Sequence, residues 1–278
     1  MLLSVIIPTC NRPDLLIKCL DTLKTSVQTI HSSYEVIVTD DSSIDETKKI
    51  LLADYSQVKW VEGPRKGPAS NRNNGASHAT GDWLVFIDDD CIPNSNILTE
   101  YQNSIFSNPD IKAFEGRIYV DQPKKSFIHE SPINETGGFF WSCNICIERK
   151  LFQQLKGFDE DFPFAAMEDV DFFRRIKQLT DKYLFVYEAA VLHPWRLNHN
   201  VIRATLNRHE SQLFYIKKHP EEGIRLNATT HFRYFVKNNI YLFTHAWRFR
   251  FSGFGKLLYC NFLQLYFGFT TLFRKSNF

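Results

Sequence analysis

Three consecutive aspartates after a short apolar run are the first residues that suggest chemistry. Asp88, Asp89 and Asp90 come directly after Trp-Leu-Val-Phe-Ile at 83–87. Neighbouring carboxylates repel one another, so a protein that holds them close usually neutralises them with a cation. On an extended backbone the side chains of Asp88 and Asp90 point to the same side, which suits Mg²⁺ or Mn²⁺. Such a cation typically bridges to the phosphates of a substrate.

A second acidic group begins a predicted helix at Glu168, Asp169 and Asp171. Acidic residues in a first helical turn are favoured by the helix dipole alone. The functional alternative is that one of these carboxylates faces a cleft as a general base. His193 follows another apolar stretch, where it is either packed in the fold or completes a metal site with the aspartates.

Strands and helices alternate along the part of the chain that must position these residues. The apolar patterns predict strands over 3–7, 34–39, 58–61 and 83–87, and another over 183–187 with Val191 and Leu192. They predict helices over 13–25 and 45–54, and a loop and helix of small residues over 67–80. This alternation indicates a parallel α/β sheet, in which ligands bind beyond the carboxyl ends of the strands. Polar clusters stand at such ends at 9–12, 40–43 and 88–90. We therefore predict an α/β fold, a mostly parallel sheet flanked by helices, with a C-terminal helical appendage.

The two common glycine-rich phosphate cradles are absent from the sequence. The turn after the first predicted strand is Pro-Thr-Cys-Asn-Arg-Pro, without the glycines of a Rossmann dehydrogenase. The segment 63–67 lacks both the spacing and the Lys-Ser/Thr of a P-loop. Phosphate binding would therefore depend on a metal ion and basic side chains.

Several motifs occur in an order that resembles family 2 glycosyltransferases, the inverting nucleotide-sugar enzymes with the A-type fold. The resemblance covers residues 2–195, about two thirds of the chain. It rests on Ser4-Val-Ile-Ile-Pro-Thr-Cys-Asn-Arg, Val38-Thr-Asp-Asp-Ser-Ser, Arg72-Asn-Asn-Gly, Gly81-Asp-Trp-Leu-Val-Phe-Ile-Asp-Asp-Asp, Trp141-Ser-Cys-Asn, Gly157-Phe-Asp-Glu, Glu168-Asp-Val-Asp and His193.

The resemblance implies a role for each matching residue. Asp169 would be the catalytic base. The nucleotide-sugar donor would be bound by Thr9, Arg12, Asp40, Asp41, Arg72, Asp88 and Asp89. The metal would be held by Asp88, Asp90 and His193, with Asp90 the direct ligand and Asp88 nearer the ribose. The acceptor side would be lined by Trp141, Asn144 and Glu168.

The implied activity is inverting transfer of a sugar from a nucleoside diphosphate sugar to a hydroxyl of a glycan or lipid-linked acceptor. The implied cofactor is Mn²⁺ or Mg²⁺, and the implied process is cell-surface polysaccharide synthesis. Cys10 departs from the family pattern, which often has a tyrosine there that stacks on the base. Two alternatives stay open: a nucleotidyltransferase, and a non-catalytic subunit that binds a nucleotide sugar or glycan.

Charge divides the chain into two regions that its net charge of +2 conceals. Residues 194–278 hold 13 of the 33 Lys and Arg but only 3 of the 31 Asp and Glu. They also hold 19 of the 41 aromatic residues. We predict a catalytic domain over 1–198 and a basic, aromatic helical region over 199–278. That region would dock on a membrane surface, pack on the catalytic domain or, least expected, bind nucleic acid.

Targeting signals are not evident at the N-terminus. The first residues lack a basic segment, and Pro8 interrupts their apolar run. The six cysteines show no regular spacing, which favours reduced thiols. No window approaches the ~20 apolar residues of a membrane-spanning helix. We therefore expect a cytoplasmic protein, either free or peripheral on the inner face of the cell membrane.

Overall fold

The computed structural model describes residues 1–224 and 227–274, and they form two compact units. The first, the sheet unit, comprises Met1–Asp121, Pro132–Asp161 and Glu168–Pro194. The second, the helical unit, comprises Gln122–Ser131, Phe162–Met167 and Trp195–Phe278, of which 225–226 and 275–278 lie outside the described residues. Three stretches up to residue 198 thus belong to the helical unit: Gln122–Ser131, Phe162–Met167 and residues 195–198. The functional division into 1–198 and 199–278 stays a prediction.

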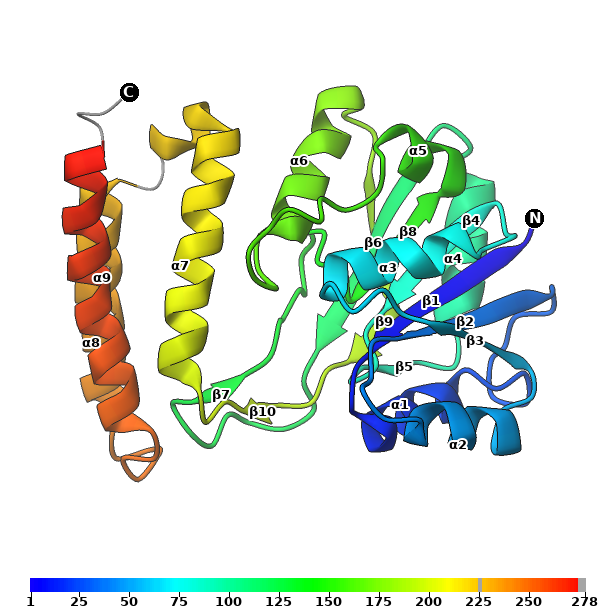
Figure 1. Ribbon diagram of the computed structural model, residues 1–278, viewed down its shortest axis with the longest axis horizontal. Helices are drawn as coiled ribbons and strands as arrows, with labels where there is room; N and C mark the ends of the chain where they lie inside the picture. Colours follow the sequence, from blue (N-terminus) through cyan, green and yellow to red (C-terminus); the bar gives the residue numbers. More distant parts are fainter. Residues whose placement is uncertain (225–226, 275–278) are drawn as a thin grey trace. The chain divides into compact units, whose positions relative to one another are not determined.

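The sheet unit is built on an eight-stranded mixed sheet (Figure 1). Its spatial order is β3 (Val58–Glu62), β2 (Tyr34–Asp40), β1 (Leu3–Thr9), β4 (Trp83–Ile87), β8 (Asn144–Glu148), β6 (Ala113–Tyr119), β9 (Leu184–Leu192) and β5 (Ile92–Pro93). Strands β1–β4 are parallel to one another, as are β6 and β9. Strand β8 is antiparallel to both of its neighbours. The predicted α/β fold with a mostly parallel sheet is confirmed.

The parallel register brings the carboxyl ends of the central strands together. Val5 of β1 pairs with Val36 on one side and Val85 on the other, and Thr9 pairs with Asp40. Every residue of β1 and β4 is buried, because helices cover both faces of the sheet. The polar residues that end these strands therefore meet at one edge.

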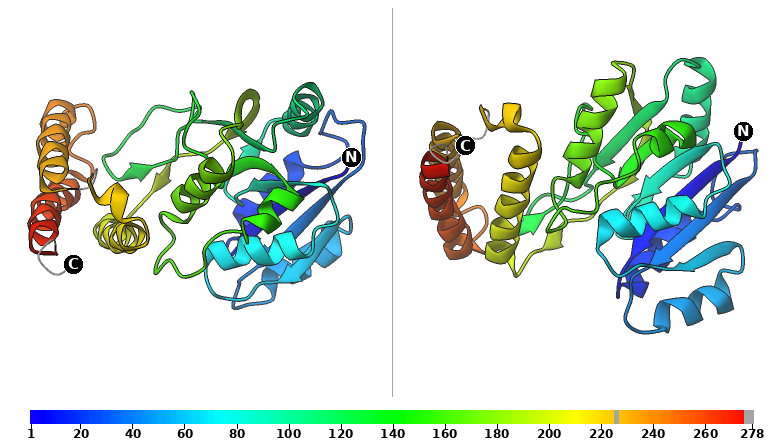
Figure 2. Two further views of the ribbon diagram at one scale, coloured as in Figure 1. Left: turned by 90° about the horizontal axis from the view of Figure 1, so that it is seen from above. Right: turned by 45° about the horizontal axis from the view of Figure 1, so that its top comes forward.

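Helices cover the two faces of the sheet (Figure 2). They are α1 (Pro13–Thr22), α2 (Glu46–Asp54), α3 (Pro68–Ser77), α4 (Ile97–Ser107), α5 (Arg149–Gln154) and α6 (Glu168–Leu179). One core cluster joins β1 and β4 to Leu16 of α1 and Tyr101 of α4. The other joins the opposite faces of the strands to Phe152 of α5 and Phe172 of α6. These packed faces fix α3 and α6, which carry Arg72 and Asp169.

The helical unit contains α7 (Val201–Lys218), the short 3-10 helix Pro220–Ile224, α8 (Ala228–His245) and α9 (Phe254–Arg274). Helices α8 and α9 pack side by side as a hairpin (Figure 1). A small antiparallel ladder pairs β7 (His129–Glu130) with β10 (Arg196–Leu197). The predicted C-terminal helices are confirmed. Among the described residues, none of the helices has the length and apolarity needed to cross a membrane.

Candidate active site

The carboxyl ends of β1 and β4 are tied together by charged and hydroxyl side chains. The Thr9 hydroxyl donates to Oδ2 of Asp89 at 2.7 Å. Nη2 of Arg12 lies 2.6 Å from Oδ1 of Asp89, and Nη1 lies 3.2 Å from Oδ2 of Asp90. Arg12 therefore joins the first β–α turn to the aspartates that follow β4. Three predicted donor residues, Thr9, Arg12 and Asp89, thus lie together.

Asp89 is fully buried. Burial raises the pKa of Asp89 to about 7, although Arg12 and the Thr9 hydroxyl oppose the shift. Its side chain faces Thr9 and Arg12 within the protein. We infer that Asp89 positions the end of β4, and that the more exposed Arg12 is better placed to meet a ligand.

Arg72 of α3 connects the aspartates after β4 to the acidic start of α6. Its Nη2 lies 2.7 Å from Oδ1 of Asp88, and its Nη1 lies 3.6 Å from Oε1 of Glu168. Burial opposes the charge of Arg72, but Asp88 and Glu168 outweigh it and raise its pKa. This ion-pair chain brings together Arg72 and Asp88, which were predicted to bind the donor, and Glu168, which was predicted to line the acceptor side.

Glu168 and Asp169 form a pair of carboxylates at the first turn of α6. Burial and the neighbouring Asp169 raise the pKa of Glu168 to about 7. Burial also raises the pKa of Asp169, while the N–H of Val170, which donates to its Oδ1 at 2.8 Å, opposes this. A carboxylate with a raised pKa binds a proton more readily, as a general base must. Asp169 is therefore chemically suited to its predicted role.

The pair predicts a pH dependence for the reaction. We expect transfer to fall as the pH is lowered through the raised pKa of Asp169, because protonation removes the base. Glu168→Gln removes a negative neighbour of Asp169 and should therefore move this acid limb to lower pH. The pH dependence of kcat/KM on the acid side measures this shift, and Asp110→Asn at an exposed position is the control.

Glu168 also makes a prediction for folding stability, with the sign set by its raised pKa. The folded protein binds the proton more tightly than the unfolded chain does, so this stabilisation is present at acidic pH. It is lost as the pH rises from the ordinary value of 4.5 through about 7. A melting temperature of Glu168→Gln that fell as steeply as that of the wild type over this range would contradict the assignment.

The predicted metal ligands separate into two groups. Nε2 of His193 lies 3.4 Å from Oδ1 of Asp90, so the structure brings these two together. Asp88 instead pairs with Arg72. A carboxylate oxygen and an imidazole nitrogen form a donor set that suits Mn²⁺ or Mg²⁺, which also accept phosphate oxygens. Asp90 and His193 therefore fit a divalent cation, whereas Asp88 belongs to the ion-pair chain through Arg72.

Cys91 lies within the same cluster, which the sequence did not indicate. The ligand atoms of Asp90, Cys91 and His193 lie within 4.8 Å of one another, and all three residues are buried. The Sγ atom of Cys91 donates to the carbonyl of Cys143 at 3.8 Å. Its proximity to Cys143 and its burial raise the pKa of the thiol. Sulfur is also a poor ligand for the hard cations Mn²⁺ and Mg²⁺, which prefer oxygen ligands.

Asp40 and Asp41 follow β2 and differ in their surroundings. Asp40 is buried and accepts from the Ser42 N–H at 2.9 Å and from Nε1 of Trp60 at 3.2 Å, so we infer that it positions the turn. Asp41 is more open and accepts from the Arg65 N–H at 2.8 Å. Exposed Cys10 lies against the carbonyl of Asp41 at 3.6 Å. The structure therefore brings Cys10 and Asp41 together, where the nucleobase of the donor is predicted to bind.

Besides Glu168, the residues predicted on the acceptor side are Trp141 and Asn144, which differ in accessibility. Trp141 is partly buried and lies against Phe139, with ring centroids 4.7 Å apart. Asn144 is buried: it accepts from Tyr101 and donates to the carbonyls of Arg117 and Ala189. We infer that Asn144 holds β6, β8 and β9 together. Of the two, Trp141 remains the residue for acceptor contact.

Glu115 was not predicted, and it organises the segment that carries Phe139 and Trp141. This buried carboxylate of β6 accepts from Nδ2 of Asn134 at 2.9 Å. It also accepts from the backbone N–H groups of Gly138, Phe139 and Phe140. A lone acidic residue in the apolar run Ala113–Tyr119 was the only signal for it.

Glu115→Gln should destabilise the sheet unit. Its amide nitrogen would face backbone donors, leaving N–H groups buried without an acceptor, at a cost of roughly 3 kcal/mol. Urea unfolding measures this loss. Glu148→Gln is the matched control, because Glu148 on β8 makes only a looser ion pair with Lys112 at 3.5 Å. Equal midpoints for the two variants would contradict the structural role of Glu115.

A comparison with protein-family models identifies the family of the chain. The sequence model described as Glycosyl transferase family 2 matches residues 4–172, more than half of the chain. A GalNAc(5)-diNAcBac-PP-undecaprenol beta-1,3-glucosyltransferase of Campylobacter jejuni is 28% identical over 227 residues, which cover 78% of this chain. A poly(ribitol-phosphate) beta-glucosyltransferase of Bacillus spizizenii is 32% identical over 143 residues, or 48% of this chain. The chain spans 62% and 22% of the lengths of these two relatives.

Solved structures support the fold. A mannosyltransferase from Pyrobaculum calidifontis, in complex with GDP-Man and Mn²⁺, aligns with a TM-score of 0.60 and 20% identity. The alignment covers 79% of this chain and 64% of that one. Residues 1–349 of TarS from S. aureus, in complex with UDP-GlcNAc, align with a TM-score of 0.59 and 19% identity, covering 76% and 64%. At such identities the likeness concerns the fold alone.

Proposed function

The chain belongs to glycosyl transferase family 2, and on this premise we propose that it moves a sugar from a nucleoside diphosphate sugar to an acceptor hydroxyl. The observation that carries the proposal is the ion-pair chain through Arg72. It joins Asp88, which follows β4, to Glu168, which begins α6. The candidate base Asp169 is the next residue after Glu168. The ion-pair chain therefore links the edge of the sheet where the donor would bind to the helix that carries the base.

On the donor side, the chain provides groups for a diphosphate. Asp90 and His193 would hold a divalent cation, which when bound stabilises the charge that develops on the leaving diphosphate. Arg12, which is 38% exposed at its side chain, can approach phosphate oxygens while it stays paired with Asp89. Asp41, beside Cys10, would contact the nucleoside.

On the acceptor side, Asp169 takes the proton of the attacking hydroxyl. The oxygen then attacks the anomeric carbon on the face opposite the leaving diphosphate, so a single displacement inverts the configuration. Glu168 and Arg72 set the charge around Asp169 and are positioning residues for this step. Trp141 would pack against an acceptor sugar ring.

The acceptor that we propose is a glycan or lipid-linked glycan of cell-surface polysaccharide synthesis. Two relatives support this class by their names: one acts on a glycan carried by undecaprenol diphosphate, and the other on poly(ribitol-phosphate). The chain spans only part of each relative, so the acceptor is inferred from the class of these enzymes. The proposed location is the cytoplasm or the inner face of the membrane.

A donor panel tests the proposed function. Uridine, guanosine and deoxythymidine diphosphate sugars are incubated with the protein and Mn²⁺, and the nucleotide products are identified. We expect a free nucleoside diphosphate from one donor, with slow transfer to water when acceptor is absent. Release of pyrophosphate from nucleoside triphosphate and sugar phosphate would instead identify a nucleotidyltransferase. Donor binding without any product in the presence of lipid-linked glycan acceptors would identify a binding subunit.

A further inference from the structure

The α8–α9 hairpin presents large apolar side chains to solvent. On α8 they are Phe232, Val236, Ile240 and Phe243, and on α9 they are Tyr259, Phe262, Leu265, Tyr266 and Phe269. We call these nine residues the hairpin face. Ile240, Phe243 and Phe269 are each 61% exposed. Single exposed apolar residues are common on protein surfaces, but a contiguous patch of them usually marks an interaction site.

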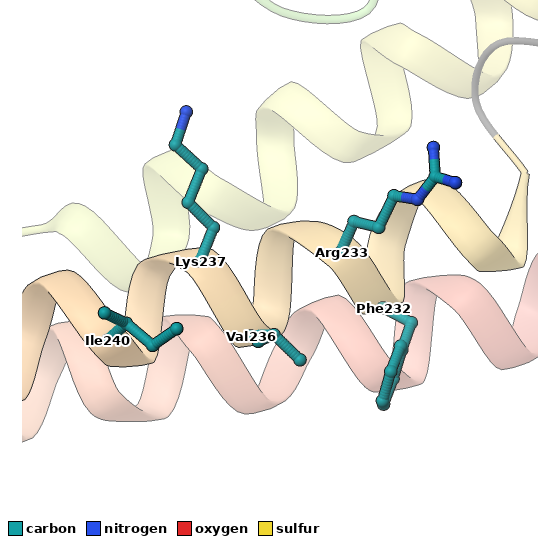
Figure 3. A pocket seen from close by; sticks show the side chains of 5 residues that line it. All are labelled: Phe232, Arg233, Val236, Lys237 and Ile240. Carbon is teal, nitrogen blue, oxygen red and sulfur yellow. The ribbon is translucent and has the colours of Figure 1, made fainter.

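The spacing of these residues gathers them into a stripe on each helix. Phe232, Val236, Ile240 and Phe243 follow intervals of four, four and three residues, which place them on one side of α8. An open groove of about 400 Å³ runs along this part of α8. Figure 3 shows Phe232 directed to one side of the helix and Arg233 and Lys237 to the other. The apolar stripe therefore has a basic margin.

Aromatic rings connect the two stripes and continue toward the turn. Phe235 lies 6.4 Å from Phe232 and 5.5 Å from Phe262 between ring centroids, so it links α8 to α9. At the turn between the helices, Trp247 is 82% exposed and packs against Phe251 at 5.2 Å.

The hairpin carries charge of one sign only. Residues 228–278 contain no Asp or Glu. The basic side chains described on the hairpin are those of Arg233, Lys237, Arg248, Arg250 and Lys256. Arg248 and Arg250 are exposed at the turn, beside Trp247. A partner of this surface must therefore have negatively charged groups next to an apolar region.

We propose that the hairpin face docks on the surface of an anionic lipid bilayer. The apolar stripe would enter the boundary between headgroups and acyl chains, with Trp247 and the tyrosines at the interface. The arginines and lysines would meet lipid phosphates, and their long stems would lie along the apolar stripe. This inference does not depend on the proposed reaction.

Two other occupants fit the surface less well. A second copy of the chain, docked through the same face, would bring the basic margins together without an acidic residue to pair them. A nucleic acid would match the charge and stack on aromatic rings. It would also leave the aliphatic side chains of Val236, Ile240 and Leu265 against polar groups.

Vesicle co-sedimentation of the full chain tests the proposal. The vesicles are phosphatidylcholine alone, or phosphatidylcholine mixed with phosphatidylglycerol, each at low and at high salt. We expect binding to the anionic vesicles that is weakened about tenfold or more by Ile240→Asp/Phe243→Asp. Both side chains are exposed, so the fold should be retained, and circular dichroism checks this. The matched control is Leu52→Asp/Phe106→Asp, which places the same charges on exposed positions of α2 and α4.

A second variant separates charge from apolar contact. Arg248→Gln/Arg250→Gln should reduce binding to anionic vesicles while leaving the weak binding to neutral vesicles unchanged. Equal binding of the wild type and both hairpin variants would overturn the proposal. So would a dimer in solution that the Ile240→Asp/Phe243→Asp variant dissociates without any lipid binding by the wild type. Binding of single-stranded RNA in place of vesicles would overturn it as well.

Discussion

Asp169→Asn is expected to lower glycosyl transfer by about 10²-fold or more while leaving donor affinity nearly unchanged. The amide cannot accept the proton of the attacking hydroxyl. It keeps an oxygen for the Val170 N–H, which donates to Oδ1 of Asp169 at 2.8 Å, so the first turn of α6 should stay intact. Donor affinity should persist because the Arg72–Asp88 pair lies on the neighbouring elements and is not removed.

The measurement combines calorimetric donor binding with the rate of transfer. Asp110→Asn serves as the surface control, since Asp110 makes only an exposed ion pair with Lys182. A variant that binds donor as the wild type does and transfers at less than about one hundredth of its rate supports the assignment. Undiminished transfer by Asp169→Asn would place the base elsewhere.

Asp90→Asn is the second change expected to have a large effect. We predict that it weakens Mn²⁺-dependent donor binding by about 10²-fold, because one charged ligand of the proposed cation is lost. His193→Gln should produce a smaller loss, since it removes a neutral ligand. Nε2 of His193 and Oδ1 of Asp90 are 3.4 Å apart, so the two variants should not be additive.

Two readouts distinguish a metal role from a structural one. Mn²⁺ binding in the presence of nucleoside diphosphate is followed by electron paramagnetic resonance, and donor binding is followed by calorimetry with Mn²⁺ or with chelator. Cys91→Ser is the matched control, since Cys91 lies in the same cluster but its sulfur is a poor ligand for a hard cation. If Asp90→Asn bound Mn²⁺ with the affinity of the wild type, the metal assignment would be wrong.

Local pattern was sufficient for most of the sheet. The apolar run at 83–87 corresponds to β4, and the strands predicted at 34–39 and 58–61 match β2 and β3 within one residue. Strands β2 and β4 are parallel and largely buried, so their hydrophobicity is nearly continuous along the chain. Strand β3 at the edge of the sheet is only partly buried and leaves Lys59 and Glu62 exposed. The antiparallel insertion of β8 between β4 and β6 was not predicted, because pairing direction depends on contacts far apart in sequence.

The sequence was sufficient to predict which types of residue form the site, but not which of them pair with one another. The positions of Asp88 and Asp90 after a strand indicated a charged cluster, yet Asp88 turns to Arg72 while Asp90 lies beside His193. Which carboxylate meets which cation is decided by the packing of α3 and α6 on the sheet. Asn144 was assigned to the acceptor from its place in a motif, whereas its burial between three strands only appears in three dimensions.

The anomeric configuration of the product tests the central claim most directly. That claim is a single displacement assisted by Asp169 on the face opposite the leaving diphosphate. Once the donor panel has identified the sugar, the linkage formed in the presence of acceptor is determined by proton nuclear magnetic resonance. We predict the configuration opposite to that of the donor. A product that retains the donor configuration would contradict the mechanism, because it would require a second displacement or attack on the same face.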